Sequence, residues 1–157
     1  MSERPIEELI ADAGAFGGMG AQHLDWIAGC GKIAAFEPGE RLFHEGEPAN
    51  DFFLLRHGRV ALELFMPGRG AMTVSTHGPG EVVGWSWLFP PYRWHLDGRA
   101  LERGSAIVFD GECLRGKAEA DHDLGYELMK RFAAQMVERL QATRIQLLDL
   151  YGQPAAI

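Results

Sequence analysis

The sequence has few residues of the kinds that mark secreted or metal-binding proteins. It contains only two cysteines, Cys30 and Cys113, among 157 residues. Two cysteines make neither a disulfide framework nor a metal-ligand spacing, so both are interpreted as small apolar side chains in a reducing cytosol. The N-terminus has no basic segment followed by an apolar run, and no stretch approaches the ~18 apolar residues of a membrane span. These absences predict a cytoplasmic protein without a leader peptide or a membrane partner.

An excess of positive charge is also missing. The formal net charge is −7 at pH 7, whereas nucleic acids and anionic membranes attract surfaces rich in Lys and Arg. Toward the C-terminus, basic residues alternate with acidic ones instead of forming a cluster. This balance argues against DNA or a membrane as the main partner.

Patterns of catalytic or metal-binding residues are absent as well. The six histidines stand singly, with no i, i+4 pair and no Cys or carboxylate at ligand spacing. A G-x-S-x-G nucleophile motif does not occur. We therefore expect neither a metal site nor an enzyme.

Three patterns follow one another along the chain. Residues 4–30 carry scattered apolar residues between Gly-rich breaks, which predicts short helices with a turn near residues 17–20. Residues 31–120 begin with period-two alternation punctuated by Gly and Pro, and residues 121–152 have the pattern of a long helix. The sequence predicts one domain over residues 1–157. It is mainly β, an antiparallel β-roll of jelly-roll type with about eight strands, short N-terminal helices and a long C-terminal helix.

The predicted long helix carries an apolar seam. Its members step by three and four residues in a heptad pattern: Ala133, Met136, Leu140, Thr143, Leu147 and Leu150. A second apolar set offers another face for the roll: Leu128, Phe132, Val137, Ile145 and Leu148. Two apolar faces favour one contact with the roll and one with a second subunit, so we expect a parallel homodimer through this helix.

The stretch "FEPGERLFHEGEPANDFFLLRHGRVAL", residues 36–62, resembles the opening of the cyclic-nucleotide-binding domain of the catabolite activator (Crp–Fnr) family. Gly39, Gly46 and Gly58 fall where that domain makes tight turns between strands. The segment "AQMVERLQAT", residues 134–143, is similar to the central dimer helix of the activators. The resemblance implies a regulatory sensor whose effector is a cyclic nucleotide such as cyclic AMP. Because the activators continue into a helix-turn-helix and this sequence ends at Ile157, we expect the sensor part alone, without DNA binding by this chain.

Residues 80–100 correspond to the phosphate-binding cassette of that family. Gly80, Glu81 and Gly84 match its G-[DE]-x-x-G opening, and "GWSWLF" predicts a short helix whose backbone N–H groups would face a phosphate, with the Ser86 hydroxyl beside them. The family's ribose-binding Glu, however, is replaced by Trp85.

The family's phosphate-binding Arg is also replaced. Counting back from Arg99 and Ala100, which match the family's R-A, places Trp94 at the Arg position. Arg93 is one residue early and points the other way in a strand. On the dimer helix, Thr143 stands where the family's Thr reaches the adenine, and Arg144 stands at the neighbouring Ser.

Three hypotheses explain the tryptophans. They line a pocket for a flat anionic or apolar ligand, they fill the vacated pocket, or they form a surface for an unknown protein partner. The first defines a candidate ligand set of Gly84, Trp85, Ser86, Trp87, Arg93, Trp94, Arg99, Thr143 and Arg144. The second makes the chain a ligand-free pseudo-domain that serves dimerisation or protein interaction.

Overall fold

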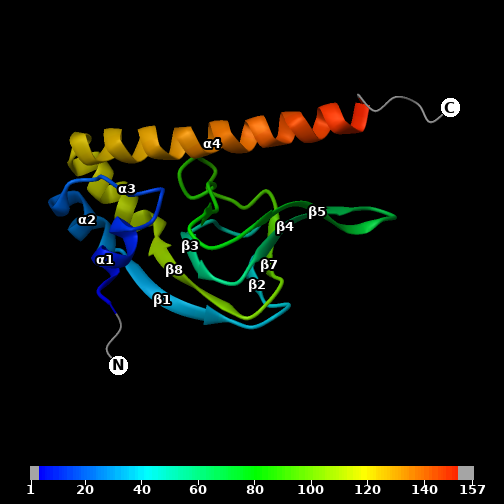
Figure 1. The fold of residues 1–157 in the computed structure, drawn as a ribbon, viewed down its shortest axis with the longest axis horizontal. Coiled ribbons are helices and arrows are strands. Elements are labelled where there is room, and N and C mark those ends of the chain that lie inside the picture. Colours follow the sequence, from blue (N-terminus) through cyan, green and yellow to red (C-terminus); the bar gives the residue numbers. More distant parts are fainter. Residues whose placement is uncertain (1–3, 152–157) are drawn as a thin grey trace.

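The computed structural model describes residues 4–151, and its element order confirms a β-roll flanked by helices (Figure 1). Two short helices come first, α1 (Ile6–Ala11) and α2 (Ala21–Ala28). The strands are β1 (Gly31–Phe36), β2 (Arg41–Phe43), β3 (Asp51–His57), β4 (Val60–Met66), β5 (Gly70–His77), β6 (Val82–Val83), β7 (Asp97–Ala100) and β8 (Gly104–Asp110). Helices α3 (Gly111–Ala120) and α4 (His122–Tyr151) follow the last strand.

The strands form two four-stranded antiparallel sheets, in the orders β1-β8-β3-β6 and β2-β7-β4-β5. Strands distant in the sequence pair directly, as β1 and β8 do in the register Gly31↔Phe109 to Phe36↔Gly104. One apolar cluster draws on both sheets: Phe36, Phe43, Ala49, Phe53, Leu55, Val60, Val83, Trp94, Ala100 and Ala106. The interior of the roll is therefore filled by side chains.

Strand β3 separates this interior from a second core beneath the helices. Phe53 and Leu55 belong to the interior cluster, whereas Phe52 and Leu54 pack with residues of the helices. Alternate residues of a strand face opposite sides of the sheet. Both sides of β3 are buried, which explains the uninterrupted apolar run in its sequence.

The buried apolar side chains of helix α4 all lie in its first half. Leu124, Leu128 and Phe132 are buried, and the later turns run on above the β4–β5 hairpin (Figure 1). Val137, Ile145 and Leu148 were expected to pack on the roll, and this expectation is wrong because each is more than half exposed. In the proposed seam, Leu140, Leu147 and Leu150 are at least half exposed too.

Helix α3 comprises residues 111–120, which the sequence pattern predicts as the last part of the roll region. Asp110 caps this helix by accepting a hydrogen bond from the Cys113 N–H at 3.0 Å. Gly111 allows the helix to begin close to the roll, because a Cβ at this position would lie 2.9 Å from the Trp87 Cβ.

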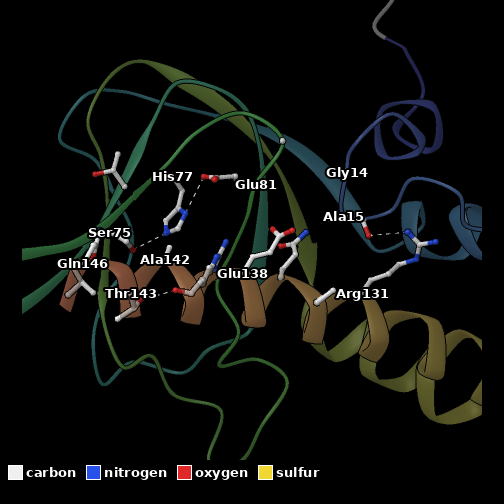
Figure 2. A pocket seen from close by; sticks show the side chains of 16 residues that line it. Gly14, Ala15, Ser75, His77, Glu81, Arg131, Glu138, Ala142, Thr143 and Gln146 are labelled. Carbon is white, nitrogen blue, oxygen red and sulfur yellow. Dashed lines mark hydrogen bonds and ion pairs between the residues drawn. The ribbon is translucent and has the colours of Figure 1, made fainter. Parts of the chain in front are cut away.

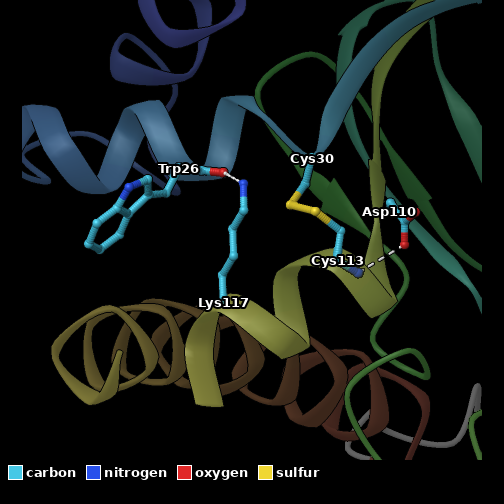
Figure 3. The surroundings of a disulfide bond; sticks show 5 residues. All are labelled: Trp26, Cys30, Asp110, Cys113 and Lys117. Carbon is cyan, nitrogen blue, oxygen red and sulfur yellow. Dashed lines mark hydrogen bonds between the residues drawn. A yellow bond between two sulfur atoms is a disulfide. The ribbon is translucent and has the colours of Figure 1, made fainter. Parts of the chain in front are cut away.

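A disulfide joins Cys30, just before β1, to Cys113 in the first turn of α3 (Figure 3). The prediction that these cysteines are separate apolar side chains is therefore wrong. The pairing of β1 with β8 brings the two ends together, and the Asp110 N–H donates to the Cys30 carbonyl. Their Cα atoms are 5.9 Å apart, within the usual disulfide range. One turn further along α3, the Lys117 ammonium donates to the Trp26 carbonyl at 2.6 Å.

Candidate functional site

The cassette begins with a glycine that its surroundings require. Gly84 follows β6 with φ +99°, a conformation that other residues rarely adopt. A Cβ here would lie 2.8 Å from Cη2 of Trp94. The expected short helix after Gly84 is a single turn, in which the Leu88 N–H donates to the Trp85 carbonyl at 3.1 Å. The Pro90–Pro91 step follows at once, and proline cannot continue the backbone pattern of a helix.

Trp94 lies inside the roll. Its side chain belongs to the interior cluster, is 6% exposed and stacks on Phe43 with ring centroids 4.0 Å apart. It therefore fills the position at which the family resemblance puts a phosphate-binding Arg. Arg93, its neighbour, has an exposed side chain that donates to the Gly46 carbonyl at 2.9 Å.

The other two indoles of the cassette pack toward α4. Trp87 is 1% exposed and stacks on Phe52 with a centroid distance of 4.6 Å. Trp85 is half-buried, and its ring meets the edge of Phe132 at 5.0 Å. Trp85, Trp87 and Trp94 thus fill separate places in the two cores.

The arginines of the predicted ligand set do not converge either. Arg99 makes a two-pronged ion pair with Glu63, with N–O distances of 2.9 and 2.8 Å. This hydrogen bonding and charge lower the pKa of Glu63, although burial of the carboxyl opposes the shift. Arg144 is exposed on α4, and Ser86 lies in the cassette turn.

A groove of about 710 Å³ separates α4 from the roll (Figure 2). It is bounded by β5, the loop before β6, the α1–α2 loop and α4. Thr143 is the one residue of the predicted ligand set that lines it. Its hydroxyl donates to the Arg139 carbonyl at 2.9 Å within α4. We call this space the α4 groove.

A hydrogen-bonded chain lies on the roll side of the α4 groove. His77 is buried, with Nε2 2.9 Å from the Ser75 hydroxyl and Nδ1 3.1 Å from a Glu81 carboxylate oxygen (Figure 2). A neutral ring with its proton on Nδ1 donates to Glu81 and accepts from Ser75. Burial and the nearby Arg139 charge lower the pKa of His77, against the opposing effect of Glu81. The groove therefore presents a neutral imidazole near pH 7.

The helix side contributes a stripe with four-residue spacing: Arg131, Gln135, Arg139 and Thr143 all line the α4 groove. Arg139 donates to the Val82 carbonyl and lies over the Trp85 ring, 5.2 Å from its centroid. Burial lowers the pKa of Arg139, although the Glu81 charge opposes the shift. The i, i+4 spacing of this stripe is visible in the sequence. The predicted apolar seam shares only Thr143 with it, and the structure places Thr143 on the groove side of α4.

The family model of the cyclic nucleotide-binding domain matches residues 33–121. The chain belongs to this family. Over 141 residues it is 25% identical to the HTH-type transcriptional regulator Cmr of Mycobacterium tuberculosis, covering 88% of this chain and 56% of that protein. Over 145 residues it is 23% identical to the CRP-like cAMP-activated global transcriptional regulator of the same species, covering 92% and 63%. The chain thus spans about 56–63% of the length of these relatives.

Solved structures agree with the fold. A protein of Geobacter metallireducens described as cyclic nucleotide-binding has a TM-score of 0.77 and 29% identity, covering 88% of this chain and 99% of that one. A cyclic nucleotide-binding domain from Methylobacillus flagellatus has a TM-score of 0.78 and 17% identity, covering 98% and 85%. The Thermus thermophilus catabolite activator protein has a TM-score of 0.68 and 21% identity, covering 88% and 62%.

This cyclic-nucleotide-binding domain therefore keeps the roll and the long helix of its family, but Trp94 fills the roll interior. Within residues 4–151, no helix is long and apolar enough to cross a membrane. The same residues hold no group of three or more His, Cys, Asp or Glu side chains that could hold a metal ion.

Proposed function

We propose that this chain is a cytoplasmic regulatory sensor that binds a small anionic effector in the α4 groove and signals through a dimer of α4 helices. The observation that carries the proposal is the groove itself. It places two arginines, a neutral histidine and a threonine around one space between the roll and the helix. Cyclic nucleotides such as cyclic AMP are the effectors that the family suggests, and the relatives named as regulators support a regulatory and non-catalytic role.

The α4 side of the groove offers hydrogen-bond donors to an anion with hydrogen-bonding edges. Arg131 and Arg139 supply guanidinium groups from α4, and Thr143 supplies a hydroxyl. The groove also holds two acidic side chains: Glu81, to which the neutral His77 ring and the Gly78 N–H donate, and Glu138. A guanidinium binds a phosphate or carboxylate through charge-assisted hydrogen bonds.

The same contacts give an effector a way to move α4. Arg139 spans the groove by donating to the Val82 carbonyl at β6, and it covers Trp85 of the cassette. An anion that draws Arg139 away from these partners would change how α4 lies on the roll. A ligand shifts such an equilibrium only by its difference in affinity for the two positions.

In this proposal, the effect of the ligand passes to a second subunit through α4. The second half of α4 exposes Leu140, Leu147 and Leu150. A group of exposed large apolar side chains often marks a protein–protein contact. A parallel pair of α4 helices would bury all three and bring Arg144 of each chain to the dimer contact.

Thermal-shift measurements with cyclic AMP, cyclic GMP, AMP and inorganic phosphate test the effector site, because a ligand raises the melting temperature with its concentration over Kd. Ala142 lines the α4 groove, whereas its neighbour Gln141 does not. Ala142→Trp should abolish the shift and Gln141→Trp should keep it. The proposal fails if no compound raises the melting temperature, or if Ala142→Trp responds like the wild type.

A further inference from the structure

A second, smaller cavity lies where the cassette meets α3 and α4. It has a volume of about 240 Å³ and is separate from the α4 groove in its lining residues. The cassette contributes Trp87 and Leu88, α3 contributes Arg115, Ala118 and Glu119, and α4 contributes Gly125, Leu128, Met129 and Phe132. We call it the junction cavity.

The lining of the junction cavity is apolar apart from a few polar groups. Leu88, Leu128, Met129 and Phe132 provide aliphatic and aromatic surface from two elements. An apolar cavity as small as ~150 Å³ holds a benzene-sized molecule. A single aromatic ring with one substituent therefore fits the space.

One of the polar groups is a buried donor without an acceptor. Trp87 is 1% exposed, and its Nε1 has no hydrogen-bond partner among residues 4–151. Buried N–H groups in folded proteins are almost always paired, and an unpaired one costs stability. The Trp87 ring therefore forms part of the buried wall of the cavity.

A cation, Arg115, also lines the junction cavity. The Arg115 guanidinium lies 4.2 Å from the Tyr92 ring centroid and donates through Nη1 to the Trp87 carbonyl. These contacts hold the side chain in place and use one of its five N–H donors. The other donors are suited to a carboxylate, which guanidinium groups bind in a matched, two-pronged geometry. Glu119 is the one acidic side chain in the lining, so the cavity holds more fixed donors than acceptors.

We propose that the junction cavity binds a small aromatic carboxylic acid in its ionised form. The ring packs among Leu128, Met129 and Phe132, and the carboxylate accepts from Arg115. Such a ligand contacts the cassette, α3 and α4 at once, so it would stabilise one arrangement of these three elements. The site is distinct from the effector site proposed above, and neither depends on the other.

Methyl NMR with benzoate as the probe tests this site. Met129 lines the cavity, whereas Met72 is exposed on β5 and does not. In protein labelled with ¹³C at the methionine methyls, benzoate should shift the Met129 signal and leave that of Met72 unchanged. A benzoate-sized ligand gives a Kd on the order of 1 mM. Benzamide, which is neutral, should bind about tenfold more weakly.

Two variants make the result decisive. Arg115→Gln should reduce benzoate affinity to that of benzamide. Arg103→Gln, at an exposed Arg that pairs with Glu37, should change nothing. The proposal is overturned if 10 mM benzoate leaves the Met129 signal in place, or if benzoate and benzamide bind equally to the wild type.

Discussion

Removing the Trp94 side chain should destabilise the domain strongly. The indole is 6% exposed, stacks on Phe43 with a centroid distance of 4.0 Å and covers Gly84 so closely that no Cβ fits there. Truncation of a buried aromatic residue to alanine costs ~3–5 kcal/mol. In a domain of this size, each kcal/mol lowers the melting temperature by about 2–4 °C. Trp94→Ala should therefore melt about 6–20 °C below the wild type.

Trp94→Arg distinguishes a roll whose interior is filled by the indole from a roll that has room for a ligand. It restores the family's cation, but it also places a guanidinium in the cluster that contains Phe43, Phe53 and Val83. A buried charge without a partner is costly, so this variant should be at least as unstable as Trp94→Ala and should not gain affinity for cyclic AMP.

Differential scanning calorimetry and isothermal titration with cyclic AMP measure both outcomes. Trp26→Ala is the matched control, because Trp26 is a half-buried indole outside the roll interior, and its loss should cost clearly less. A stable Trp94→Arg protein that binds cyclic AMP more tightly than the wild type would refute the reasoning.

Three further predictions concern assembly, covalent structure and pH. Leu140→Asp should convert a dimer to monomers in light scattering, since it places charges in the apolar helix contact; a wild-type monomer at micromolar concentration would contradict the dimer. Cys113→Ser should cost about 4–5 kcal/mol, the chain-entropy value for a cross-link with a sequence separation of 83 residues. A reductant should lower the melting temperature of the wild type but not that of the variant, and equal sensitivity would show that the disulfide is not formed. Because the pKa of His77 in the folded protein is lowered from 6.5, the unfolded chain binds protons more readily just below that pH. The free energy of unfolding, measured with urea, should therefore be highest above pH 6.5 and should fall as the pH decreases below it. His77→Gln should flatten this part of the pH profile.

The sequence predicted the roll because its period-two alternation and turn residues are local signals. The two short helices before β1 and the long α4 could be read in the same way. Helix α3 was harder, because Gly111 and Gly116 weaken the helical pattern, and its start is fixed by the Asp110 cap and by close packing on Trp87. The disulfide could not be read at all, since only the β1–β8 pairing brings its two cysteines together.

The site was less predictable for a related reason. The family resemblance identified Trp94 as the unusual residue, but whether an indole lines or fills a space depends on Phe43, which comes from another strand. Arg99 was included as an anion ligand, yet it pairs with Glu63 while its neighbour Ala100 is buried in the roll interior. Alternate residues of a strand point to opposite sides of the sheet. Once Ala100 is known to face the interior, the neighbouring Arg99 side chain must point away from it.

The disulfide also determines how mechanical load passes through the protein. Cys30 precedes β1 by one residue and Cys113 follows β8 by three, so the covalent cross-link closes a ring that contains all eight strands. The segment with α1 and α2 and the segment with α4 leave this ring at two Cα atoms only 5.9 Å apart. Tension applied between those two segments is carried across the sulfur–sulfur bond and bypasses the strands. While the bond is intact, pulling on α4 does not unravel the roll, and α4 acts on the roll through its surface contacts, such as the Arg139 hydrogen bond to the Val82 carbonyl.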